Sequence, residues 1–192
     1  GSVVYNKNHT AMPNGTGLFG SSSSTQSAII APVPGSLVEF FVFTNKSLNI
    51  VTGVNYSGLS YSRVNMDLVG NGSVSCPLGD VVSGIKNIAM ADTTNEKIAI
   101  VPHANGIDYW VVCQGSTWNN LTSFLVTSAG VSAVPIITTS PFMGGAMGEL
   151  KASPQGDYLA AAQLVMQDPV LGWPEGVVLE SELQILGFDN NT

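Results

Sequence analysis

The sequence predicts an all-β fold of short antiparallel strands, and three observations support this prediction. Apolar runs of strand length, such as residues 38–43 and 109–113, alternate with turns rich in Gly, Asn, Ser and Pro. Helical periodicity is nearly absent. The 192-residue chain has 44% hydrophobic but only 10% charged residues, against about 25% charged residues in an average soluble protein. The chain can therefore bury a sizeable core, and Ser, Thr, Asn and Gly must keep it soluble.

Three segments share one pattern of a short strand, a turn that contains Pro and Gly, and a second apolar strand. These segments are residues 27–44, 98–114 and 148–163. The turns carry the pairs Pro32 and Gly35, Pro102 and Gly106, and Pro154 and Gly156. Each predicted hairpin is followed by another strand-like run, at residues 58–68, 121–131 and 182–189. The pattern indicates three repeated antiparallel units.

The run "GDYLAAAQLVMQD" (156–168) is the one stretch whose composition would allow a helix. It follows "SPQG" and occupies the same place in its unit as "EFFVF" and "YWVVC" in the other two. We therefore predict a strand here, with small Ala side chains suited to a crowded position.

A strand meander exposes both faces of its sheet and must stack on neighbours to bury them. The repeats favour a single β-propeller-like domain over residues 1–192, with three four-stranded blades at roughly 27–70, 98–140 and 148–192. A β-sandwich is the alternative. Three blades cannot close a ring, so we expect a fragment of a larger propeller, or open edges that residues 1–26 cover or that pair in a homo-oligomer.

Composition excludes several classes of partner. The net charge is −7 and Arg63 is the only arginine, so nucleic acid is not an expected partner. No apolar run of about 18 residues exists, so no membrane insertion is expected. No carboxylates cluster at metal-ligand spacing, and no cofactor or metal is expected. Gly1 and Ser2 are typical of a cloning remnant, so a natural signal peptide is expected to have been removed.

Four stretches carry a resemblance to a known group of proteins. They are "YNKNHTAMPNGTGLFGSSSSTQSAIIAPVPG", "GLSYSRVNMDL", "NEKIAIVPHANGIDYWVV" and "SPQGDYLAAA". They resemble the N-terminal propeller-like region of large secreted Bacteroidota proteins with gliding-motility or type IX secretion sorting domains. "SPQGDYLA" is also similar to a turn of TolB-like and WD40-like blades. The resemblance implies a propeller fold and an extracellular or cell-surface location, and it implies no known chemistry.

His103 and Asp108 share one hairpin turn, and two interpretations of this pair stay open. A His–Asp pair could serve a glycan- or ester-directed hydrolase, although no G-x-S-x-G motif is present. We favour the interpretation that the His103 ring caps backbone groups of the turn and that Asp108 bonds local N–H groups. The chain is then a non-catalytic scaffold or binding module that contacts protein or glycan.

Trp118 and Trp173, together with His103 and Asp108, are the candidate binding residues. Tyr109 and Trp110 lie in a strand and are both predicted to be core residues. Trp118 and Trp173 lie in loop-like segments, "GSTWNN" and "VLGWPEG", where an exposed ring would suit a sugar or a partner protein. The same rings could instead fold back over an open blade edge.

Two cysteines, Cys76 and Cys113, lie 37 residues apart and form no metal-binding motif. Cys113 lies in an apolar run and is expected to be a buried free thiol. A disulfide between the two is the less favoured alternative.

Overall fold

The computed structural model describes residues 1–46, 58–115, 119–139, 147–167 and 178–192, with backbone alone for 164–167 and 178–180. Every regular element in these ranges is a β-strand, and all strand pairs are antiparallel. The all-β prediction is therefore confirmed. The described part of the chain contains no helix able to cross a membrane.

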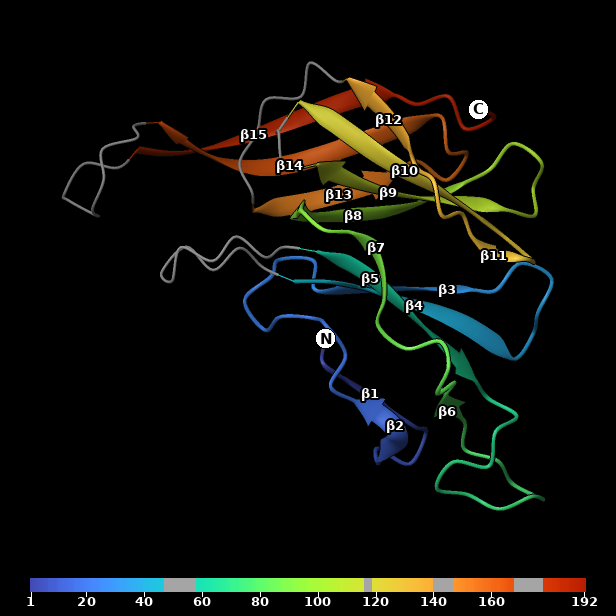
Figure 1. Ribbon diagram of the computed structural model, residues 1–192. Helices are drawn as coiled ribbons and strands as arrows, with labels where there is room; N and C mark the ends of the chain where they lie inside the picture. The colour runs from blue at the N-terminus through green and yellow to red at the C-terminus, as the bar shows by residue number, and fades with distance from the viewer. Residues whose placement is uncertain (47–57, 116–118, 140–146, 168–177) are drawn as a thin grey trace.

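The strands form one hairpin and three larger sheets that follow one another along the chain (Figure 1). The N-terminal hairpin pairs β1 (Val3–Tyr5) with β2 (Ala11–Thr16). Sheet 1 contains β3 (Ala28–Pro32), β4 (Glu39–Asn45), β5 (Leu59–Asn65), β6 (Asp80–Val81) and β7 (Ile88–Ala91). Sheet 2 contains β8 (Thr94–Pro102), β9 (Tyr109–Gly115), β10 (Asn120–Thr127), β11 (Gly130–Val131) and β12 (Ile136–Thr139). Sheet 3 contains β13 (Gly148–Ala152), β14 (Tyr158–Gln167) and β15 (Val178–Gly187).

The three sheets differ from the predicted four strands each. In sheets 1 and 2 the fourth position is split between two short strands that pair with the same neighbour, β6 and β7 with β5, and β11 and β12 with β10. Asn87, at φ 56°, precedes β7, and Pro135, which lacks an N–H to pair, precedes β12. The described part of sheet 3 has three strands.

Residues 158–167 form β14, so the strand predicted for "GDYLAAAQLVMQD" is confirmed. Leu159 and Ala161 are completely buried against sheet 2. In an extended chain successive side chains point to opposite faces, which places Ala160 on the other side of the sheet.

Consecutive sheets stack face to face (Figure 1), and each contact contains an apolar cluster. Phe41 and Phe43 of sheet 1 pack on Val111 of sheet 2, and burial of each such ring contributes roughly 1.5–3 kcal/mol. Trp110 and Val112, on the opposite face of sheet 2, pack against sheet 3. The outer face of sheet 1 is covered by Met12 and Leu18 from the N-terminal region.

The turns of sheets 2 and 3 have the same register, with Pro102 paired to Tyr109 and Ala152 paired to Leu159, whereas the turn of sheet 1 is longer by one residue. Pro32 and Pro102 are the last residues of β3 and β8 and pair with Phe40 and Tyr109, whereas Pro154 lies inside its turn. Gly35, Gly106 and Gly156 all have positive φ, between 71° and 80°, a conformation that glycine adopts without steric cost. The Gly prediction is thus confirmed at all three turns, while the prolines are not equivalent.

Candidate functional site

The turn between β8 and β9 carries the predicted pair His103 and Asp108, both partly buried. His103 Nδ1 accepts a hydrogen bond from the backbone N–H of Asn105 at 3.0 Å. The Asn105 amide donates to Asp108 Oδ2 at 2.7 Å, and its Oδ1 accepts from the N–H groups of Ile107 and Asp108. The three polar side chains therefore stabilise their own turn.

The His103 ring caps a backbone N–H group of its own turn, as the sequence predicted. Asp108 differs in detail, because its carboxylate accepts from a side-chain amide rather than from backbone N–H groups. Within the described residues no hydrogen bond joins the His103 ring to the Asp108 carboxylate, the contact that orients a catalytic histidine. The two residues are joined through backbone, where His103 N–H donates to Asp108 O at 3.0 Å.

The His103 ring also stacks on Trp110, with ring centroids 5.8 Å apart and an interplanar angle of 24°. Trp110 Nε1 donates to Asn190 O at 3.1 Å, and Ala104 N donates to the same oxygen at 3.2 Å. Asn190 donates in turn to Gln155 O, in the next hairpin turn. The stretch after β15 thus joins the turns of sheets 2 and 3 at one end of the stack.

Tyr109 and Trp110 are 7% and 5% exposed, so their prediction as core residues is confirmed. The Tyr109 hydroxyl donates to Pro32 O, which links sheet 2 to the turn of sheet 1. Burial raises the pKa of Tyr109 above its ordinary value. Trp118 and Trp173 lie outside the described residues.

A groove of about 470 Å³ lies beside Trp110, between the outer strands of sheet 2 and the end of sheet 3. Apolar and hydroxyl-bearing side chains line it together with one carboxylate, among them Trp110, Leu121, Phe188, Thr138, Thr139 and Asp189. No cationic side chain among the described residues lines the groove. Asp189 accepts hydrogen bonds from Asn191 N and from the Thr192 hydroxyl. The lining suits a neutral ligand with both apolar and hydroxyl groups.

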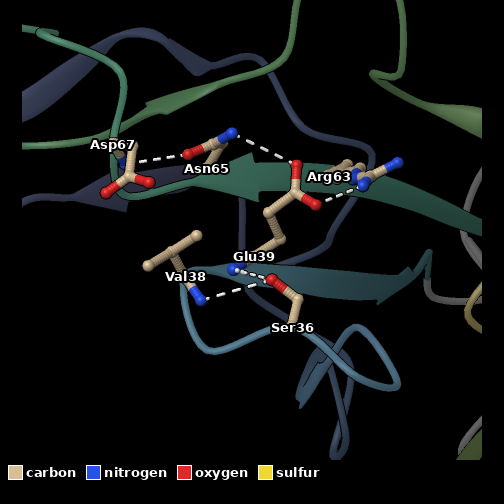
Figure 2. Close-up of polar contacts among 6 residues, drawn as sticks. All are labelled: Ser36, Val38, Glu39, Arg63, Asn65 and Asp67. Carbon is tan, nitrogen blue, oxygen red and sulfur yellow. Dashed lines mark hydrogen bonds and ion pairs between the residues drawn. The ribbon is translucent and has the colours of Figure 1, made fainter.

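Arg63 is held in sheet 1 by an ion pair with Glu39 (Figure 2). Asn65 donates to the other oxygen of the same carboxylate at 3.2 Å, and the Glu39 N–H donates to Ser36 Oγ at 3.1 Å. Figure 2 shows Glu39 on β4 beside Arg63 and Asn65 on β5, with Ser36 in the turn before β4. Arg63 thus forms an ion pair within its own sheet, where it stabilises the pairing of β4 and β5.

A buried polar row crosses the interface between sheets 2 and 3. Lys97 is completely buried, and its ammonium donates to Gln114 Oε1 at 2.8 Å and lies 3.5 Å from Gln163 Oε1. Gln163 Nε2 reaches Glu182 Oε2 at 3.2 Å. Burial lowers the pKa of Lys97 from 10.5 to about 8, and the nearby Glu96 carboxylate raises it in part.

The segment before β3 runs along this row and ties the first strands of the sheets together. Gln26 Oε1 accepts from the N–H groups of Ile98 in β8 and Leu150 in β13, at 3.0 and 2.8 Å. Thr25 N donates to Glu96 at 2.7 Å. Sequence reasoning missed these residues, because polar side chains in a Ser-, Asn- and Gln-rich chain give no local sign of burial.

Metal binding and disulfide formation find no support in the described ranges. Those ranges contain no group of three or more His, Cys, Asp or Glu side chains placed to hold a metal ion. Cys76 is exposed and Cys113 is buried, and both are free thiols, as favoured from the sequence. Burial raises the pKa of the Cys113 thiol to about 12.

Comparison with known proteins leaves the interpretation to this geometry. No protein-family model, no curated protein and no solved structure matches the chain.

Proposed function

We propose that this chain is a non-catalytic binding module of a secreted or cell-surface bacterial protein, and that its ligand is a neutral glycan. The groove beside Trp110 is the observation that carries this proposal. Its volume of about 470 Å³ lies within the roughly 300–1,000 Å³ range of small-molecule sites. A sugar ring has apolar C–H faces and many hydroxyl groups, which match the apolar side chains and the threonine hydroxyls that line the groove.

The absence of a cationic lining makes the neutral class preferable to an acidic sugar. A sialate or uronate carboxylate needs a positive partner when it is removed from water. The Asp189 carboxylate in the groove would repel such a group, whereas it can accept hydrogen bonds from neutral hydroxyls.

The non-catalytic part of the proposal rests on the turn at residues 103–108. A general base needs a free lone pair within reach of substrate, but His103 Nδ1 already accepts a backbone N–H and the ring stacks on Trp110. Asp108 is bonded to Asn105 instead of to the histidine. His103, Asn105 and Asp108 therefore stabilise the turn that lies next to Trp110, one of the residues that line the groove.

A propeller-like arrangement of the three sheets is part of the same proposal. The first strands of the sheets lie together, β3 beside β8 and β8 beside β13, and Gln26 bridges the latter two. Farther out, the groove separates β12 from the end of β15. Sheets that converge at their first strands and diverge at their outer strands are typical of blades around an axis. The low charge content and the sequence resemblance support the extracellular setting.

An array of neutral oligosaccharides tests the glycan ligand. We expect wild type to bind a subset of neutral glycans and Thr138→Trp, which fills the groove from an exposed position, to lose that binding. Val74→Trp is the control, because Val74 is 90% exposed and does not line the groove. Absence of binding by wild type, or equal binding by Thr138→Trp, contradicts the proposal. Capture of a protein partner that Thr138→Trp abolishes would replace the glycan with a protein ligand.

A further inference from the structure

Sheet 3 presents one face to sheet 2 and the opposite face to solvent. Leu150, Leu159 and Ala161 point toward sheet 2 and are buried. The alternate residues lie on the open face, where Tyr158, 52% exposed, is at the turn end of β14. Beyond it, the strand register defines two cross-strand rows. The first row is Glu149, Ala162 and Leu183, and the second row is Lys151, Ala160 and Ile185.

The open face is apolar along β15 and charged along β13. Leu183 is 70% exposed and Ile185 is 68% exposed. On β13, Lys151 Nζ lies 3.2 Å from Glu149 Oε1, and both side chains are exposed. Contiguous apolar side chains on an open sheet face are typical of an interaction surface.

The equivalent faces of sheets 1 and 2 are covered. Phe41 and Phe43 on β4 pack under sheet 2, and Trp110 and Val112 on β9 pack under sheet 3. Ala160 and Ala162 hold the corresponding places on β14, the middle strand of sheet 3. Within the described residues nothing packs on this face of sheet 3. It therefore corresponds in position to the buried faces of sheets 1 and 2 but is exposed.

We propose that a second copy of this chain packs on this face through a two-fold axis that runs across the strands. Such an axis exchanges the two rows: Glu149 then faces Lys151 of the second copy, and Leu183 faces Ile185 of the second copy. Ala160 and Ala162 meet at the centre, where their small side chains allow the sheets to approach closely. Each charge meets its opposite and each apolar side chain meets another, as an isologous interface requires.

Other ways of joining two copies fit less well. A two-fold axis parallel to the strands would place the charged β13 of one copy on the apolar β15 of the other. A head-to-tail stack would need the outer face of sheet 1, which Met12 and Leu18 already cover. The sequence had predicted pairing through open strand edges, whereas this surface is a sheet face.

Sedimentation velocity over a range of protein concentrations tests the proposal. We expect a reversible dimer of wild type, and a loss of affinity of about tenfold or more for Ile185→Asp, because a carboxylate would be buried against an apolar partner. Leu37→Asp is the matched control: Leu37 is a 95% exposed apolar residue in the turn of sheet 1, and this variant is expected to dimerise as wild type does.

A charge-swap series tests the two-fold axis itself. Lys151→Glu places two acidic side chains opposite each other in the dimer and is expected to weaken it. The double variant Glu149→Lys, Lys151→Glu restores opposite charges across the same axis and is expected to restore association. All positions are on the surface, and circular dichroism verifies that each variant keeps its β-structure. A wild type that is monomeric at every concentration, a dimer that Ile185→Asp leaves intact, or a double variant no tighter than Lys151→Glu would overturn the proposal.

Discussion

The Lys97 ammonium lies 2.8 Å from Gln114 Oε1 inside the stack, with the Gln163 amide oxygen at 3.5 Å from the opposite sheet. The amide oxygens are neutral, and the nearby Glu96 carboxylate offsets only part of the cost of burying the ammonium. Burial therefore favours the neutral amine and lowers the pKa of Lys97 to about 8. The stability of the folded protein is therefore expected to depend on pH through Lys97.

Stability is expected to rise with pH because of Lys97. The pKa of Lys97 is about 8 in the folded protein, and its ordinary value is 10.5. Between these pH values the unfolded chain binds more protons than the folded protein, so the free energy of unfolding increases as pH rises. The contribution over this window is about 3 kcal/mol. Denaturant unfolding of wild type and Lys97→Met measures it: wild type should gain stability relative to the variant from pH 8 to 10.5. A constant difference between the two proteins contradicts the prediction.

Cys76 and Cys113 are expected to react very differently with a thiol reagent. Cys76 is exposed, whereas Cys113 is buried and its pKa is raised to about 12, so it has almost no thiolate at neutral pH. A disulfide-exchange assay should titrate one thiol in the native protein and two after denaturation. Cys76→Ser should remove the native signal. Rapid reaction of two native thiols would show that Cys113 is accessible.

Asn105 is expected to stabilise the turn of sheet 2 more than His103 does. Asn105→Ala removes two accepted backbone hydrogen bonds and the bond to Asp108, while His103→Ala removes one accepted bond and the contact with Trp110. With net values near 1 kcal/mol per hydrogen bond, we expect losses of about 3 kcal/mol for Asn105→Ala and about 1 kcal/mol for His103→Ala. Thermal or denaturant unfolding measures both.

The same His103→Ala variant separates the binding module from a hydrolase. In the proposed module, glycan binding is nearly unchanged. A hydrolase activity in wild type that this substitution abolishes would contradict the non-catalytic function.

Gly156 is expected to tolerate alanine less well than Gly106, although both occupy equivalent places in their turns. Their φ angles are 77° and 71°, so each substitution carries a conformational cost of roughly 1–2 kcal/mol. A Cβ at Gly156 would also lie 2.6 Å from Pro102 O and 2.8 Å from Asn190 Nδ2, whereas a Cβ at Gly106 meets nothing within 4 Å. Gly156→Ala should therefore melt at the lower temperature. Equal melting temperatures of the two variants would contradict the close contact of Gly156 with Pro102 and Asn190.

Local chemistry made much of the fold predictable from the sequence. Apolar runs and turn residues act over a few positions, and they located the strands of all three repeated hairpins, including the Ala-rich β14. The glycines indicated the positions of the turns, because these positions have positive φ, which favours glycine. The similarity of the turns did not reveal that Pro154 lies inside its turn while Pro32 and Pro102 end their strands, because the end of a strand depends on its hydrogen bonds to the partner strand.

The sequence by itself determined an all-β chain with repeated hairpins, a buried Tyr109 and Trp110, and a histidine that caps its own turn. Only the tertiary structure decided which polar residues are buried together: Lys97 and Gln163 are separated by 66 positions and meet because sheets 2 and 3 stack. The groove beside Trp110 and the two rows on sheet 3 arise in the same way. Periodicity shows which side chains share a face, but the neighbour of that face is set by packing between distant segments.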